Sequence, residues 1–197
     1  IGSICGVAIA GIMSDRLGRR PTMFISAALF TLSGICCAIA PNFHFLVAAR
    51  IIGGLGIGII SVVAPVYISE ISITRYRGQL VSLYQLAVTV GFLAAYVVNY
   101  LLLNFSHTGH FANSWLQLIF VGEVWRGLLG MEGLPALFFL IILFLIPESP
   151  RWLITQTKDS RAAAIFSKIY TSGEDVAKQV ADTKSTIAGE TKSEWKQ

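Results

Sequence analysis

The sequence predicts an all-α membrane protein, and three features of its composition carry this prediction. Of the 197 residues, 54% are hydrophobic and only 13% are charged, which is about half the charged share of an ordinary soluble domain. The mean hydropathy is +0.68. Fifteen of the 26 charged residues lie in the last 50 positions. So few charged residues cannot cover the surface of a soluble enzyme of this length. The basic residues behind the net charge of +4 are too scattered for a nucleic-acid-binding surface.

Five apolar stretches reach, or nearly reach, the length of about 20 residues that a membrane-spanning helix needs. The chain starts without Met inside the first of them, so we expect that stretch to be the remainder of a longer helix and the chain to be part of a longer protein. Isolated Gly and Pro residues argue little against these helices, because both are frequent in membrane spans. The predicted spans are 1–14, 22–40, 45–68, 79–103 and 127–146.

The basic residues predict the orientation of these spans in a cell membrane. Arginines cluster at 16–20 and at 75–77, and Lys and Arg recur after residue 150, whereas 41–45 and 104–124 contain neither. Loops rich in Lys and Arg stay in the cytoplasm. The sequence therefore predicts a multi-pass protein with the arginine-bearing loops and the C-terminal segment in the cytoplasm and the 104–124 loop outside.

The character of the chain changes near residue 149. Ser149-Pro150 is a typical start of a helix, and the residues that follow alternate polar and apolar with a helical period. We expect short cytoplasmic helices here and a linker over 189–197. The predicted organisation is thus a membrane part, 1–148, and a cytoplasmic part, 149–197.

Two charged residues lie well inside predicted spans. Arg50 is in the third span and Glu132 in the fifth, each a few residues from the outer end, so an ion pair between them is geometrically possible. A charge inside the membrane is costly and is usually paired or functional. The pair could simply hold two helices together, or it could form a relay for protons or for conformational change.

The fourth span has one polar face. At about 100° per residue, five side chains fall within an arc of about 80°. Amides and hydroxyl groups can bond sugar hydroxyls, and aromatic rings can pack on the apolar faces of a sugar, so we favour an aqueous cavity that binds a neutral polyhydroxyl ligand over a polar contact between helices. The members of this polar stripe are Gln85, Thr89, Phe92, Tyr96 and Asn99.

Other patterns do not support an enzyme or a metal protein. The glycine run after Arg50 lacks the spacing of a dinucleotide-binding loop, and Gly54-x-x-x-Gly58 is better explained as a close helix-packing face. His107 and His110 have no third ligand nearby in the sequence. With no catalytic cluster visible, we expect no enzymatic activity, no cofactor and no metal.

Several motifs together resemble the sugar porter family of the major facilitator superfamily. The order and spacing are specific to that family, and the segments LVSLYQ (80–85), VNY (98–100) and WR (125–126) are most similar to those of bacterial D-xylose–proton symporters. The family motifs are GIMSDRLGRR (11–20), RIIGGLGIG (50–58), PVYISE (65–70), RG (77–78) and PESPRWL (147–153).

The resemblance implies a partial N-terminal six-helix bundle of a twelve-helix major facilitator fold, in which the five spans are helices two to six. Helix one and the C-terminal half would then be missing partners. Gln85 matches a sugar-binding glutamine of the family, whereas Phe92 replaces a sugar-contacting glutamine of the xylose-type members. Arg50 and Glu132 match charged residues linked to proton coupling. A cytoplasmic gate network would consist of Asp15, Arg16, Arg19, Glu70, Arg77, Glu148 and Arg151.

The function that we expect is transport of a monosaccharide, a hexose or a pentose, by alternating access and with protons. The expected partners are the sugar, protons, the lipid bilayer and the rest of the same transporter, with no nucleic acid. The coupling carboxylate of the family's symporters lies on helix one, outside this chain, so facilitated diffusion stays open. A transporter-like sugar sensor is the third alternative.

Overall fold

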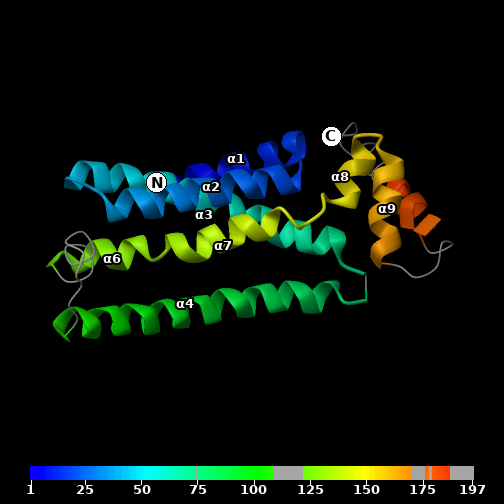
Figure 1. The fold of residues 1–197 in the computed structure, drawn as a ribbon. Coiled ribbons are helices and arrows are strands. Elements are labelled where there is room, and N and C mark those ends of the chain that lie inside the picture. The colour runs from blue at the N-terminus through cyan, green and yellow to red at the C-terminus, as the bar shows by residue number, and fades with distance from the viewer. Residues whose placement is uncertain (74, 109–121, 170–175, 178, 187–197) are drawn as a thin grey trace.

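The computed structural model describes residues 1–73, 75–108, 122–169, 176–177 and 179–186, and every regular element in these ranges is a helix (Figure 1). This confirms the predicted all-α class. Among the described residues, four helical stretches are long and apolar enough to cross a membrane: Arg19–Ala38, Phe43–Ile71, Arg77–Ser106 and Val124–Leu143. The helices are α1 (Gly2–Leu17), α2 (Arg19–Ala38), α3 (Phe43–Ile71), α4 (Arg77–Thr108), α6 (Val124–Gly130), α7 (Gly133–Leu143), α8 (Pro150–Thr155) and α9 (Asp159–Ile169).

The helices extend beyond most of the predicted spans. For example, α3 covers the predicted 45–68 and adds residues at both ends, and α4 continues past the predicted end at 103. Hydropathy marks only the apolar part of a helix, whereas the backbone hydrogen bonds continue into polar residues. Of the predicted outer loop, 109–121 lie outside the described residues, as do the side chains of His107 and His110 and the predicted linker 189–197.

Small residues bring α1, α2 and α3 into close contact. A Cβ atom on Gly58 of α3 would lie 2.9 Å from the Cα of Gly6 on α1, and one on Gly56 would lie 2.8 Å from the carbonyl oxygen of Ser26 on α2. The Ser26 hydroxyl also donates a hydrogen bond of 2.7 Å to the Gly56 carbonyl. Gly54 faces α1 as well. The predicted helix-packing role of Gly54 and Gly58 is therefore confirmed.

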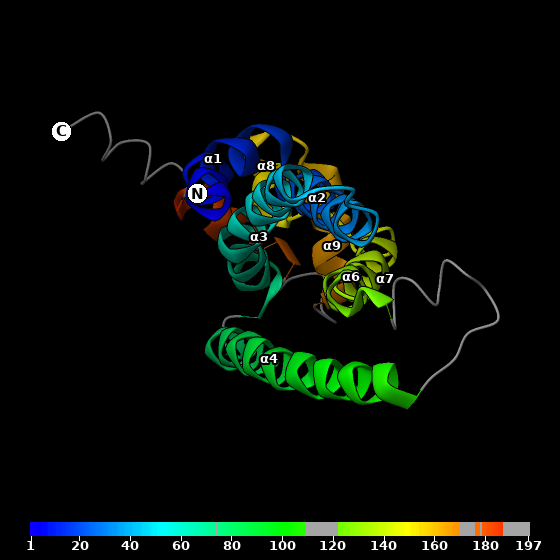
Figure 2. The ribbon, with the colours of Figure 1, turned by 90° about the vertical axis from the view of Figure 1, so that its left-hand side faces the viewer.

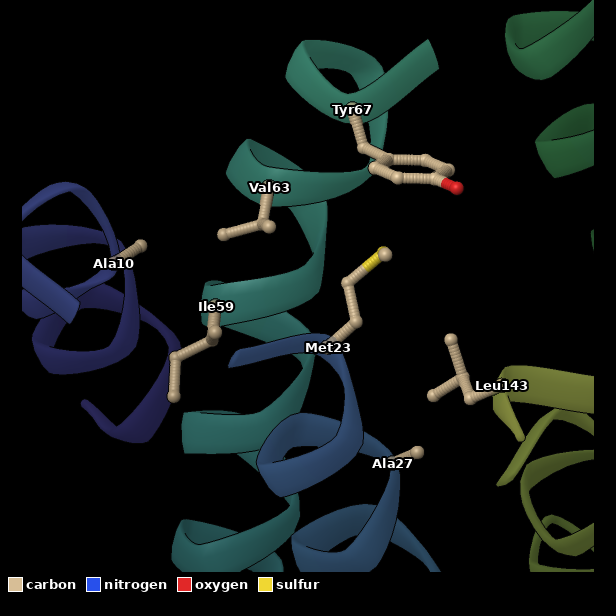
Figure 3. Packing of buried hydrophobic residues seen from close by; sticks show 7 residues of the cluster. All are labelled: Ala10, Met23, Ala27, Ile59, Val63, Tyr67 and Leu143. Atoms are coloured by element: carbon tan, nitrogen blue, oxygen red, sulfur yellow. The ribbon is translucent and has the colours of Figure 1, made fainter. Parts of the chain in front are cut away.

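The main apolar cluster lies between α1, α2, α3 and α7 (Figure 3). In this view Met23 of α2 lies between Val63 and Tyr67 of α3 and Leu143 of α7. The Tyr67 hydroxyl donates to the Pro147 carbonyl at 2.9 Å, so this buried tyrosine has a hydrogen-bond partner. The cluster consists of Ala10, Met23, Ala27, Ile59, Val63, Tyr67 and Leu143.

The fifth predicted span differs from the prediction, because it is interrupted at Met131–Glu132 between α6 and α7. Pro135 explains the break. It has no N–H to donate to the Met131 carbonyl four residues earlier, and the N–H of Leu134 donates to that carbonyl instead, at 3.2 Å. The sequence interpretation had treated Pro135 as harmless. The interruption places Glu132 at the start of α7 rather than in the middle of a continuous helix.

Helix α4 runs alongside the other long helices but apart from them (Figure 2). None of its membrane-length window is buried. Its least exposed positions near the start, Val81, Tyr84 and Val88, repeat with helical spacing, so this face is turned toward the rest of the protein.

At one end of the long helices, α8 and α9 form a separate small unit (Figure 1). Leu153 and Ile154 of α8 pack with Ala162 and Phe166 of α9 in a second apolar cluster. Val176 and Val180, from the described residues that follow α9, pack against it. We call this end of the long helices the α8 end.

Candidate functional site

A cluster of polar side chains occupies the α8 end, and we define it by Asp15, Arg19, Glu70, Glu148 and Ser149. Arg19, in the first turn of α2, donates from Nε and Nη2 to the two carboxylate oxygens of Glu70 near the end of α3, both at 2.9 Å. Its Nη1 donates to Asp15 Oδ1 at 3.1 Å. The side chains of Arg19 and Glu70 are only 13% and 6% exposed. Such a two-bond arginine–carboxylate pair is among the stronger polar contacts in proteins.

The Glu148 side chain caps the first turn of α2. Its Oε1 accepts hydrogen bonds from the backbone N–H groups of Arg19 and Arg20, both at 3.0 Å, and from that of Ser149 at 2.9 Å. The first N–H groups of a helix have no partner within the helix, and the helix dipole favours a negative charge there. The segment that follows α7 is therefore fastened to the start of α2 by charge as well as by hydrogen bonds.

The tight turn between α1 and α2 requires glycine at position 18. Gly18 has φ 102° and ψ 164°, a combination that other residues rarely adopt. A Cβ atom at this position would also lie 2.6 Å from Glu148 Oε2. Glycine thus permits both the chain reversal and the close approach of the carboxylate.

Ser149 and Trp152 attach α8 to the same cluster. The buried Ser149 hydroxyl donates to Glu70 Oε2 at 2.6 Å, and its oxygen accepts the N–H of Trp152 at 3.4 Å, as an N-cap does. The Trp152 indole N–H donates to the Asp15 carbonyl at 2.8 Å. These bonds join the start of α8 to the ends of α1 and α3.

The structure brings four of the seven expected gate residues into direct contact, namely Asp15, Arg19, Glu70 and Glu148. Arg77 and Arg151 border the same cavity as Glu70, which has a volume of about 270 Å³. Arg16 is exposed and makes no ion pair with any other described residue.

A second polar contact lies toward the other end of the long helices. Arg50 Nη1 of α3 and Glu132 Oε1 at the α6–α7 junction form an ion pair of 2.6 Å, so the two charges lie together as the sequence suggested. The side chains are 47% and 23% exposed. Glu70 is twenty residues further along α3, or about 30 Å at 1.5 Å per residue. The ion pair and the polar cluster are therefore separate sites.

Helix α2 packs closely against the α6–α7 junction that carries Glu132. A Cβ atom on Gly34 would lie 2.8 Å from the Cα of Gly133 and 3.6 Å from the Cγ of Glu132. One turn further along α2, the Cβ of Ala38 would lie 2.9 Å from a Cβ atom on Gly130 of α6. Glycines on both sides thus allow α2 to touch the α6–α7 junction directly.

The polar stripe of α4 is exposed along its length. Phe92 and Tyr96 are 66% and 75% exposed, and the Thr89 hydroxyl is bonded to the Gln85 carbonyl of its own helix at 3.1 Å. At 100° per residue the centre of the stripe is turned by about 65° from the centre of the face that carries Val81, Tyr84 and Val88. The five predicted ligand residues are therefore neighbours on one helix face: Gln85, Thr89, Phe92, Tyr96 and Asn99.

Sequence reasoning missed several residues that build the polar cluster. Arg20 was used only as a topology signal, but its Nε and Nη2 donate to the carbonyls of Leu143 and Phe144 at 3.1 and 2.9 Å. A basic side chain there satisfies the free carbonyls at the end of α7. The role of Gly18 was also missed, as was the hydrogen bond from Ser149 to Glu70. The helix start at Ser149-Pro150 was predicted, and Ser149 is the N-cap of α8.

Comparisons with known proteins agree with this architecture. The sequence profile of the family described as "Sugar (and other) transporter" matches residues 1–197. The chain is 38% identical to a probable inositol transporter 2 of Arabidopsis thaliana over 189 residues, covering 96% of this chain and 30% of that protein. It is 40% identical to an arabinose-proton symporter of Bacillus subtilis over 179 residues, covering 91% of this chain and 36% of that protein.

A solved structure of a major facilitator superfamily protein is also similar. The proton:xylose symporter XylE, bound to 6-bromo-6-deoxy-D-glucose, matches with a TM-score of 0.82 and 35% sequence identity, covering 96% of this chain and 42% of that chain. The chain spans about a third of the length of the two curated relatives described above. It therefore belongs to the sugar transporter family of the major facilitator superfamily and contains a part of that fold.

Proposed function

We propose that the complete transporter to which this chain contributes carries a monosaccharide, a hexose or a pentose, across a cell membrane by alternating access and together with protons. The Arg50–Glu132 ion pair is the observation that carries the proton part of the proposal. Charged residues within apolar helices are costly and usually mark an ion or substrate pathway. The names of two similar proteins, an arabinose-proton symporter and a proton:xylose symporter, support the same chemistry.

The polar stripe of α4 is the proposed sugar-binding face. Gln85, Thr89 and Asn99 supply groups that both donate to and accept from hydroxyl groups, and Phe92 and Tyr96 supply rings that pack on the apolar face of a sugar. Phe92 stands where the xylose-type members have glutamine, so we expect one hydrogen bond fewer and more apolar contact than in those members.

The polar cluster is the proposed gate on the cytoplasmic side. Its charged side chains, which pair with one another within this chain, would bind the second half of the transporter in one state and release it in the other. A network that differs between states shifts the equilibrium of alternating access. Arg16, Arg77 and Arg151 supply further positive charge beside the cluster. The part of the chain over 149–197 would then belong to a cytoplasmic helical domain, and 1–148 to the membrane domain.

Membrane topology has its own test. Single cysteines at Arg75 and at Lys158, in the full-length transporter without its native cysteines, should react with an impermeant thiol reagent only from the cytoplasmic side. A cysteine at His107 should react only from the outside. Labelling of positions 75 and 107 from the same side would contradict this orientation.

Transport is tested with the purified full-length protein in proteoliposomes. We expect radiolabelled xylose, glucose, arabinose or inositol to accumulate when the medium outside is acidic and a protonophore to abolish that accumulation. Equilibration without accumulation, and with no effect of the protonophore, would instead identify a uniporter. Saturable binding without any flux would identify a sensor. Gln85→Ala should weaken binding in each of these cases if the stripe is the sugar site.

A further inference from the structure

The helices that carry Arg50 and Glu132 meet through α2. Helix α3 packs along α2, and so do α6 and α7, whereas neither α6 nor α7 packs extensively against α3 in the described part of the chain. Arg50 Nη1 nevertheless lies 2.6 Å from Glu132 Oε1. The separation of the two charges therefore depends on how closely each of the two sides approaches α2.

Ser33 makes the contact between α2 and α3 next to this ion pair. Its side chain is buried, and its hydroxyl donates to the carbonyl of Ala49, the residue before Arg50, at 2.8 Å. Glycine at position 53, one turn after Ala49, leaves room for this side chain, because a Cβ atom on Gly53 would collide with the Ser33 hydroxyl. Ser33 thus fixes the start of α3, and with it Arg50, relative to α2.

Gly34, the next residue, makes the contact between α2 and the α6–α7 junction. It is buried, and a Cβ atom on it would lie 2.8 Å from the Cα and 2.9 Å from the backbone nitrogen of Gly133, the residue after Glu132. The same Cβ would lie 3.6 Å from the Cγ of Glu132. Backbone atoms cannot move aside as the end of a side chain can, so any side chain at position 34 pushes the start of α7 away from α2.

We propose that Ser33 and Gly34 are positioning residues for the Arg50–Glu132 ion pair. Ser33 holds α3 against α2, and the missing side chain at position 34 lets α7 approach α2 far enough for the Glu132 carboxylate to reach the guanidinium. This inference rests on the coupling role proposed above for the pair. It predicts that one methyl group at position 34 breaks the ion pair without changing either charged residue.

A glycine at a helix contact can also serve packing alone. Both roles predict a loss of stability for Gly34→Ala, so stability by itself does not distinguish them. They differ in the interaction between the two charges. If Gly34 positions the pair, Arg50→Gln and Glu132→Gln become additive once residue 34 is alanine, whereas packing alone leaves them as non-additive as they are in the wild type.

The experiment measures thermal midpoints of the purified full-length transporter. The proteins compared are the wild type, Arg50→Gln, Glu132→Gln and the double mutant, each with and without Gly34→Ala. We expect a non-additive shift of the midpoint in the wild-type background, and we expect Gly34→Ala to reduce this non-additive part by more than about half.

Gly56→Ala is the matched control. A Cβ atom on Gly56 would also lie 2.8 Å from a backbone atom, the carbonyl oxygen of Ser26, but this contact is six residues further along α3 than Arg50. At 1.5 Å per residue the two positions are about 9 Å apart. Gly56→Ala should therefore lower the midpoint and leave the non-additive part unchanged.

Transport in proteoliposomes gives the second readout. Proton-driven sugar accumulation reports coupling, and sugar counterflow without a pH gradient reports the transport cycle alone. We expect Gly34→Ala to lower accumulation about tenfold while counterflow changes little, as for loss of one hydrogen bond to a charged group. Gly56→Ala should leave the ratio of the two readouts unchanged.

A non-additive part that is unchanged in Gly34→Ala, or reduced equally in Gly56→Ala, would overturn the proposal. A wild-type cycle that is already additive would also overturn it. If Gly34→Ala does not fold, Ser33→Ala replaces it and Ser26→Ala becomes the control, because each loses one hydroxyl that donates to a carbonyl of α3. A reduction in Ser33→Ala alone supports the proposal, and equal values in the two variants refute it.

The two readouts also separate this inference from the proposed symport. If the wild-type protein shows no proton-driven accumulation, the symport fails, and the thermal midpoints still decide the positioning role. Loss of the non-additive part in Gly34→Ala with unchanged accumulation would refute the coupling role of the ion pair, on which the inference rests. A parallel loss of accumulation and counterflow in Gly34→Ala would show packing alone and would overturn the proposal.

Discussion

Replacing Gly18 by alanine would perturb the turn between α1 and α2 in two ways. The backbone at φ 102° and ψ 164° would be strained by any side chain, at a cost of about 1–3 kcal/mol. The new Cβ would also lie 2.6 Å from Glu148 Oε2, so the carboxylate must move away. Its three backbone hydrogen bonds, at 2.9 to 3.0 Å, would weaken at a further cost of about 1–2 kcal/mol. We therefore expect a total loss of stability of about 2–5 kcal/mol.

Thermal unfolding of the purified protein in detergent measures this loss, and a double-mutant cycle with Glu148→Ala divides it. Without the carboxylate, Gly18→Ala should cost only its backbone strain, so the two substitutions should be non-additive by about 1–2 kcal/mol. Leu17→Ala, at the exposed neighbouring position, is the control and should stay within about 0.5 kcal/mol of the wild type. An unchanged midpoint for Gly18→Ala, or strict additivity with Glu148→Ala, would refute this account of the turn.

Three further predictions concern the polar cluster, the stripe and the ion pair of the full-length transporter. Arg19→Lys replaces the two hydrogen bonds to Glu70 by one and should destabilise the protein by about 1.5–3 kcal/mol, measured by the same thermal unfolding. No loss of stability would contradict the two-bond contact between Arg19 and Glu70. Gln85→Ala should weaken sugar binding by about 1–3 kcal/mol in calorimetry, and Phe92→Gln should shift preference from glucose toward xylose; unchanged affinities in both would reject the stripe as the binding face. The charge-swapped Arg50→Glu/Glu132→Arg protein should be more stable and more active than the sum of the two single substitutions predicts, and a merely additive result would show that the pair does not interact.

Much of the fold was predictable because membrane spans leave a strong signal in composition. The apolar runs located the helices, and the glycine pair Gly54 and Gly58 indicated a close helix-packing face, although not that α1 is the helix packed on it. The break at Glu132 was missed, although Pro135 carries its cause. A proline in a span is often tolerated, so only the backbone shows whether a neighbouring N–H takes over the freed carbonyl, as that of Leu134 does.

The site could be predicted in part, and the reason is the distance in sequence between its members. Arg50 and Glu132 could be paired because each is a rare charge in a span and both lie at similar depth. The contacts of Glu148 with the first turn of α2 could not be anticipated, since they join backbone N–H groups to a side chain more than a hundred residues away.

Sugar-induced proton movement in proteoliposomes tests the central claim most directly. When sugar is added to an unbuffered suspension of vesicles that contain the full-length protein, we expect the medium to become alkaline in proportion to sugar uptake. Glu132→Gln should abolish this alkalinisation and retain sugar counterflow, because the ion pair would be needed for coupling and not for sugar binding. Alkalinisation that is equal in the wild type and in Glu132→Gln, or sugar uptake without any proton movement, would contradict the account.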